Sequence, residues 1–149
     1  MPDLMSPSTV ADRLAITDLT IAYCWALDTR DWDRLDDVFS ADVTAELASP
    51  TLVGVEAIKA RIKLALVPLD DSQHIVANHQ IVIEGDQATC RCYLHAQHVR
   101  RGVEGGDNLV IGGRYEDTMV RTADGWRINH RRLVMMWREG NEAVLHPPT

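Results

Sequence analysis

Apolar residues in the first half of the chain recur every three to four positions, whereas in the second half they alternate with polar residues. The first pattern predicts amphipathic helices, and the second predicts strands with one buried face. The alternation is clearest after Gly85-Asp86, where Ala88, Cys90 and every second residue after them form an apolar face. The predicted elements are helices over 9–27, 32–39 and 55–66, a short strand over 43–48, and long strands over 72–84, 87–100, 108–121 and 126–138.

Capping and turn residues set the boundaries of these elements. Thr9 and Asp12 have the spacing of a helix N-terminus, which leaves residues 1–8 as a loose leader. Gly112-Gly113 falls inside a predicted strand and indicates a bulge or kink there. Residues 146–149 are predicted to be disordered or to form an arm that faces a partner.

Helices followed by long strands are typical of an α+β fold with the helices on one face of the sheet. Strands of this length exceed the usual range, so the sheet must bend. A bent sheet with helices across its open side encloses a hollow, and such hollows bind ligands. We therefore predict one domain with a core over about residues 9–138 and an internal pocket.

Composition narrows the classes of partner and compartment. The 149 residues suit one domain, and a net charge of −7 disfavours binding to nucleic acid or to an anionic membrane surface. The three cysteines, together with an N-terminus unlike a signal peptide, predict reduced thiols in the cytoplasm. No apolar run is long enough to span a membrane.

Metal and cofactor sites are not expected from the motifs. His95 and His98 are three residues apart on a strand and therefore point to opposite faces. Cys90 and Cys92 share a face, but no nearby pair completes a four-ligand set. The glycine patterns of nucleotide-binding loops are absent from the sequence, so we expect neither a metal nor a cofactor.

Three segments carry a resemblance to a known family: YCWALDTRDW at 23–32, HIVAN at 74–78, and GRYED at 113–117 together with GWRINHR at 125–131. Together they resemble the SnoaL-like branch of the NTF2-like superfamily. The resemblance implies a cone-shaped, curved antiparallel sheet crossed by three helices. Within that branch the chain is most similar to dehydratases and dehydrochlorinases, which use a His–Asp pair. Asp28 and His74 occupy the matching positions.

The residues themselves leave each catalytic role open. Asp28 closes an apolar helix, where a carboxylate needs a partner to offset the helix dipole, although it also suits a plain turn. His74 can act as a base near neutral pH or can be a half-buried structural histidine. The resemblance makes Tyr23 a donor to a leaving group or carbonyl, but Tyr23 also fits the helix's apolar stripe.

The predicted substrate-binding residues have equally ordinary alternatives. The resemblance places His98 and Arg131 in the pocket, whereas the residues alone also allow a structural histidine and an Arg131–Asp117 ion pair. A further set of apolar residues would form the pocket wall or simply belong to the core. These residues are Trp25, Leu133 and Met135, with Met136 and Trp137 beside them.

The resulting hypothesis is a cofactor-independent lyase of the dehydratase type. His74, oriented by Asp28, would remove a proton from a small apolar, cyclic or aromatic substrate. Two alternatives remain open: an isomerase or cyclase of the same fold, and a non-catalytic small-molecule binding or assembly domain. The family resemblance also implies a homodimer or homotrimer.

Overall fold

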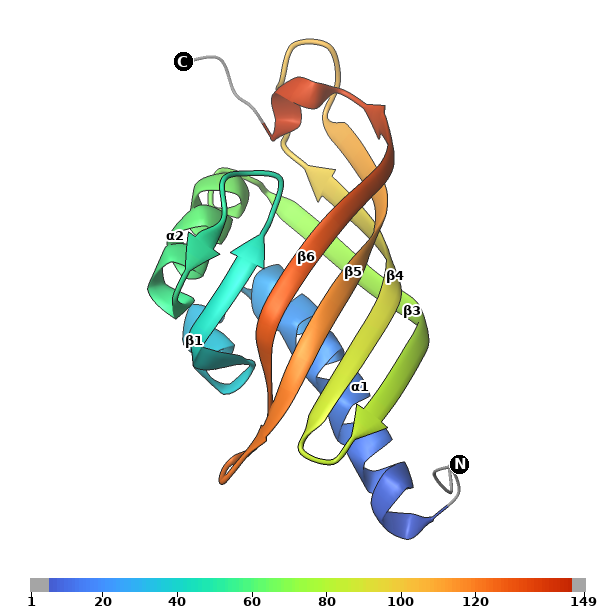
Figure 1. The fold of residues 1–149 in the computed structure, drawn as a ribbon. Helices are drawn as coiled ribbons and strands as arrows, with labels where there is room; N and C mark the ends of the chain where they lie inside the picture. The colour runs from blue at the N-terminus through green and yellow to red at the C-terminus, as the bar shows by residue number, and fades with distance from the viewer. Residues whose placement is uncertain (1–5, 146–149) are drawn as a thin grey trace.

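The computed structural model describes residues 6–145 and has the α+β architecture that the sequence predicts (Figure 1). Residues 1–5 and the predicted C-terminal arm at 146–149 lie outside the described residues. The elements are α1 (Pro7–Thr29), η1 (Trp32–Asp37), β1 (Phe39–Glu46), β2 (Leu52–Val53), α2 (Val55–Leu66), β3 (Asp71–Glu84), β4 (Gln87–Val99), β5 (Asn108–Thr122), β6 (Gly125–Gly140) and η2 (Glu142–Val144).

The described strands form one six-stranded sheet in the order β2-β1-β6-β5-β4-β3. The long strands β3 to β6 pair antiparallel with their neighbours, but β1 runs parallel to β6. The prediction of an antiparallel sheet is therefore wrong for this pair. Alternation shows which side chains share a face and carries no information on the direction of a distant partner strand. Helix α1 lies across the sheet and contacts β3 and β6 (Figure 1).

The predicted bend at Gly112-Gly113 is present as a register shift between β5 and β6. A Cβ atom on Gly112 would run into the indole ring of Trp137, and one on Gly113 would lie 2.5 Å from the Val134 carbonyl oxygen. Only glycine allows the two strands to approach so closely here. The bend is confirmed and has a steric cause.

The predicted boundaries of α2 are confirmed, and those of the four long strands are within two residues of the observed ones. The start of α1 was predicted wrongly. Ser6 is the N-cap, accepting from the Thr9 backbone N–H at 3.3 Å, and proline follows it at the first helical position. Asp12 instead accepts two hydrogen bonds from Arg121.

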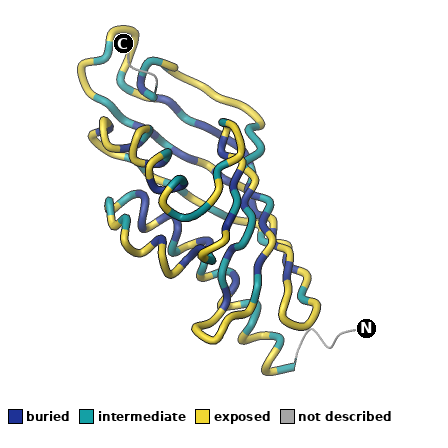
Figure 2. The backbone as a smooth tube through the Cα atoms, turned by 60° about the vertical axis from the view of Figure 1, so that its left-hand side comes forward, coloured by how far each residue is buried: buried dark blue, intermediate teal, exposed yellow. Residues whose placement is uncertain are grey.

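Two further elements differ from their predicted form. The second helix is a 3₁₀ helix that ends at Asp37, and β1 begins at Phe39 rather than at residue 43. The first residues of β1 do not alternate regularly between buried and exposed, and the pairing of this segment with β6 has an irregular register. Figure 2 shows that the buried residues follow the strands and the sheet-facing side of α1. Among the described helices, none combines the length and apolar character needed to cross a membrane.

Candidate active site

A cavity of about 110 Å³ lies between the sheet and the two α-helices. Its volume is comparable with the ~150 Å³ engineered cavity that accepts benzene, so it suits a group about one ring in size. Its lining is mostly apolar and includes His74 and His98. The cavity is therefore a small, largely apolar chamber with imidazole groups on its wall.

The end of α1 brings Asp28 to the start of β3. Asp28 Oδ1 lies 2.7 Å from His74 Nδ1, and Asp28 Oδ2 accepts from the His74 backbone N–H at 2.8 Å. The helix ends at the next residue, Thr29, because the C-cap residue Arg30 adopts a left-handed conformation (φ 62°) and its N–H turns back to the Leu27 carbonyl. The contact expected between Asp28 and His74 is thus present in the structure.

A third hydrogen bond reaches the Asp28 carboxylate from Ser72, whose hydroxyl lies 2.9 Å from Oδ1. Arg30 Nη1 in turn donates to Ser72 Oγ at 3.0 Å. Because arginine has no acceptor, it occupies a lone pair of the hydroxyl and leaves the hydroxyl hydrogen for Asp28. The sequence analysis missed Ser72 and Arg30. The available signal was that Ser72 precedes His74 by two residues and so shares its strand face.

These contacts favour an ionised Asp28 and one tautomer of His74. Burial works against ionisation of Asp28, but hydrogen bonds and charge from His74, together with Ser72, lower its pKa below the ordinary value. When His74 is neutral, its hydrogen lies on Nδ1 facing the carboxylate, which leaves a free lone pair on Nε2. Among the described residues, Arg131 Nη1 is the one buried side-chain nitrogen or oxygen found without a hydrogen-bond partner. Nε2 of His74 also has no partner there but is not among the buried atoms, so it remains accessible.

His98 lines the cavity beside His74, with the two ring centroids 5.6 Å apart. Burial, with the neighbouring His74, lowers the pKa of His98 to about 4, so the ring is neutral at physiological pH. Its Nδ1 lies 3.2 Å from the Leu109 carbonyl oxygen and must carry the hydrogen. His98 therefore lies in the pocket, as the resemblance implied, and offers a hydrogen-bond acceptor at Nε2.

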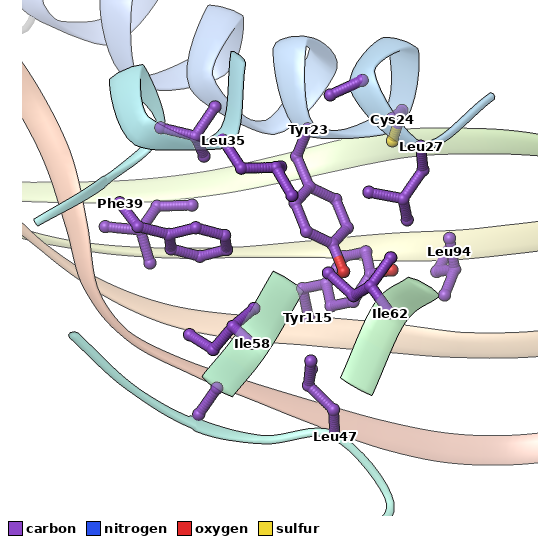
Figure 3. Packing of buried hydrophobic residues seen from close by; sticks show 14 of the residues in the cluster. Tyr23, Cys24, Leu27, Leu35, Phe39, Leu47, Ile58, Ile62, Leu94 and Tyr115 are labelled. Atoms are coloured by element: carbon purple, nitrogen blue, oxygen red, sulfur yellow. The ribbon is translucent and has the colours of Figure 1, made fainter. Parts of the chain in front are cut away.

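Tyr23 also lines the cavity, at its buried end. Figure 3 shows its ring extending from α1 toward Ile62 and Tyr115, and the two tyrosine rings meet edge to face with centroids 5.6 Å apart. Burial raises the pKa of the Tyr23 phenol despite the nearby Arg131 charge. The hydroxyl thus stays protonated and can donate a hydrogen bond.

Arg131 does not line the cavity, which corrects its prediction as a substrate-binding residue. Its side chain is fully buried, and Nε and Nη2 each donate to Asp117 at 2.8 Å. The guanidinium carbon lies 4.3 Å and 3.9 Å from the ring centroids of Tyr23 and Tyr115. Arg131 therefore forms a structural ion pair with Asp117 beneath the two tyrosine rings. The two residues meet because they are directly opposite each other on β5 and β6.

The apolar wall was predicted in part. Leu133 and Met135 line the cavity, as expected. Trp25 does not: the residue is 63% exposed and lines a separate outer hollow that also borders His74. The helical spacing of α1 turns Trp25 away from Tyr23, while Met136 and Trp137 are also largely exposed. Within residues 6–145 we find no cluster of three potential metal ligands.

Solved structures with this fold come from several proteins. A protein of Novosphingobium aromaticivorans described as a candidate aromatic ring hydroxylase is 30% identical, with a TM-score of 0.81 over 91% of this chain and 97% of that one. A candidate scytalone dehydratase of the same species is 21% identical (TM-score 0.82, 93% of each chain). A hexachlorocyclohexane dehydrochlorinase is 20% identical (TM-score 0.79, 93% of this chain and 95% of that one).

Sequence comparison points to one family. An uncharacterized protein of Mycobacterium tuberculosis is 32% identical over 132 residues, which cover 86% of this chain and 88% of the relative. The family model of the SnoaL-like domain matches residues 8–132, a range that contains Asp28, His74 and most of the cavity wall. The chain belongs to the SnoaL-like domain family.

Proposed function

We propose that the protein is a cofactor-independent lyase that catalyses an elimination, with His74 as the base and Asp28 as the residue that orients it. The observation that carries this proposal is the 2.7 Å contact between Asp28 Oδ1 and His74 Nδ1 at the wall of an apolar cavity. A base needs a free lone pair within reach of the substrate, and the tautomer fixed by Asp28 provides one at Nε2.

In the proposed step, His74 Nε2 takes a proton from a substrate carbon. The electrons of that C–H bond form a double bond to the adjacent carbon, and the leaving group departs with its own bonding pair. The resulting imidazolium lies against the ionised Asp28, which stabilises its charge. When the leaving group is hydroxide, the imidazolium or the Tyr23 phenol supplies the proton that makes it water.

The surroundings of His74 support this chemistry. Its side chain is 6% exposed, so a bound substrate would exclude most water from the reacting atoms. Tyr23 is a neutral donor on the cavity wall, whereas His98 is a neutral acceptor that can hold a substrate hydroxyl. The names of two structural neighbours, a candidate dehydratase and a dehydrochlorinase, describe eliminations and agree with the proposal.

The test uses a panel of one-ring compounds that carry an acidic C–H next to a carbon with a leaving group. We expect His74→Ala and Asp28→Asn to lower kcat/KM, the former by about 10²–10⁴-fold. His95→Ala is the matched control, because His95 is an exposed histidine on the outer face of β4. Circular dichroism and thermal melts establish that each variant is folded.

Product mass separates this proposal from its rivals. Elimination gives a product that is lighter by the leaving molecule, whereas isomerisation and cyclisation leave the mass unchanged. Hydroxylation, the activity in the description of the 30%-identical neighbour, adds an oxygen. Full turnover in both folded variants, or a product without loss of mass, would refute the lyase assignment.

A further inference from the structure

We propose that the substrate of this cavity carries an anionic group, bound by Arg61 at the cavity mouth. The inference rests on the proposed function, since it names the substrate class of the same site. Arg61 comes from α2 and lines the cavity together with Ile62 and Ala65. Sequence analysis did not select it, and neither the catalytic proposal nor the packing of the core uses it.

The charge of the cavity lining is one-sided. Apart from its two histidines, the ionisable side chains that residues 6–145 contribute to it are the buried phenols of Tyr23 and Tyr115 and the guanidinium of Arg61. Among the residues that the structure describes, no aspartate or glutamate lines the cavity, and the Asp28 carboxylate lies behind His74. Arginine keeps its positive charge at any physiological pH. A chamber with one fixed positive charge favours a negatively charged ligand.

Arg61 differs from the other cations of α2 in its contacts. Lys59 is paired with Asp36 at 2.7 Å and with Glu56 at 3.5 Å. Lys63 is exposed and lies outside the cavity lining. For Arg61, the described part of the chain supplies neither an ion pair nor a side-chain hydrogen bond. Its guanidinium is therefore available to a ligand, and it can hold a carboxylate by two parallel hydrogen bonds.

The exposure of the lining residues gives the ligand an orientation. Arg61, Ala65 and Leu145 are partly exposed and mark the mouth, whereas Ala96 and Tyr115 are buried and mark the floor. An anionic group at Arg61 leaves the apolar part of the ligand pointing inward. The cavity volume of about 110 Å³ limits that part to roughly one ring. The inferred substrate is a one-ring compound with a carboxylate away from the reacting carbon.

Binding of two matched probes tests the inference without requiring turnover. Cyclohexanecarboxylate and cyclohexanecarboxamide have the same shape and differ in charge. By isothermal titration calorimetry we expect the wild-type protein to bind the carboxylate about tenfold or more tightly than the amide, as a charge-assisted hydrogen bond allows. Arg61→Gln should abolish the preference and Arg61→Lys should restore part of it. Lys63→Gln removes the same charge from the same helix and should keep the preference.

Two results would overturn the inference: equal or absent binding of the two probes by the wild-type protein, and a carboxylate preference that survives in folded Arg61→Gln. The preference should also weaken as salt is added, since the guanidinium is partly exposed. His74→Ala separates this inference from the lyase proposal. If His74→Ala keeps both turnover and the carboxylate preference, the lyase proposal fails and the anion site stands.

Discussion

Two carboxylate pairs, Asp117–Arg131 and Asp28–His74, differ in burial and in their hydrogen bonds. Asp117 and Arg131 have fully buried side chains and are joined by two hydrogen bonds of 2.8 Å. Asp28 and His74 are joined by one side-chain hydrogen bond, and the Asp28 side chain is 17% exposed. The first pair lies beneath the two tyrosine rings, whereas His74 of the second pair lies on the cavity wall with Asp28 behind it.

The comparison shows that a buried pair becomes reactive only when one partner keeps a usable atom. A guanidinium has donors alone and cannot take a proton at physiological pH, so Arg131 can hold Asp117 but cannot serve as a base. An imidazole bound through Nδ1 still presents Nε2. Chemical type and accessibility together distinguish the candidate catalytic pair from the structural one.

Among the variants that test this comparison, Arg131→Met is expected to have the largest effect, a loss of stability. Breaking a buried ion pair leaves an uncompensated charge, so we expect a loss of about 3–5 kcal/mol in the free energy of unfolding. The double variant Asp117→Leu/Arg131→Met should recover most of it, because no buried charge remains. Urea denaturation measures both. A folded Arg131→Met with wild-type stability would remove the structural role.

A smaller effect is expected from Ser72→Ala, which takes one donor from Asp28 while leaving the His74 contact in place. We expect kcat/KM to fall by about tenfold or less, since one hydrogen bond contributes about 1–1.5 kcal/mol. Because the carboxylate is then less well stabilised as an anion, the pH profile of kcat/KM should also shift. Ser72→Thr keeps the hydroxyl and should restore the profile. An unchanged profile in Ser72→Ala would limit Ser72 to packing.

The smallest effect is expected in the acid stability of Asp28→Asn. The pKa of Asp28 in the folded protein is lowered below its ordinary 3.8, since the His74 and Ser72 contacts outweigh burial. Its stabilising contribution is therefore complete above about pH 4 and is lost as the pH falls through the lower folded pKa. The free energy of unfolding of the wild-type protein should drop more steeply there than that of Asp28→Asn. Parallel curves would contradict this.

Much of the fold could be predicted because its signals are local. The four long strands and α2 follow from alternation and helical spacing, and the bend follows from Gly112-Gly113. The parallel pairing of β1 with β6 was missed because it joins residues more than eighty positions apart. The Ser6 cap was missed because Thr9 and Asp12 offered a plausible start three residues later.

The site was harder to predict than the fold, because it depends on where side chains converge. Family resemblance placed Asp28 and His74 together, while the residues alone left both roles open. It also placed Arg131 in the pocket, although the residues allowed the Asp117 pair that the structure contains. Arg61 had one local signal: it follows Ile58 by three residues and precedes Ala65 by four, so it borders the buried face of α2.

The proposed catalytic residues and the cavity mouth come from different elements, and this separation has an evolutionary consequence. The proposed base and its orienting carboxylate come from β3 and α1, whereas the mouth residues come from α2 and the segment after η2. Mutations in the latter elements can alter the size and charge of the accepted molecule while the proton-transfer apparatus keeps its geometry. One ancestral chain of this design could therefore diversify into enzymes with one reaction and many substrates.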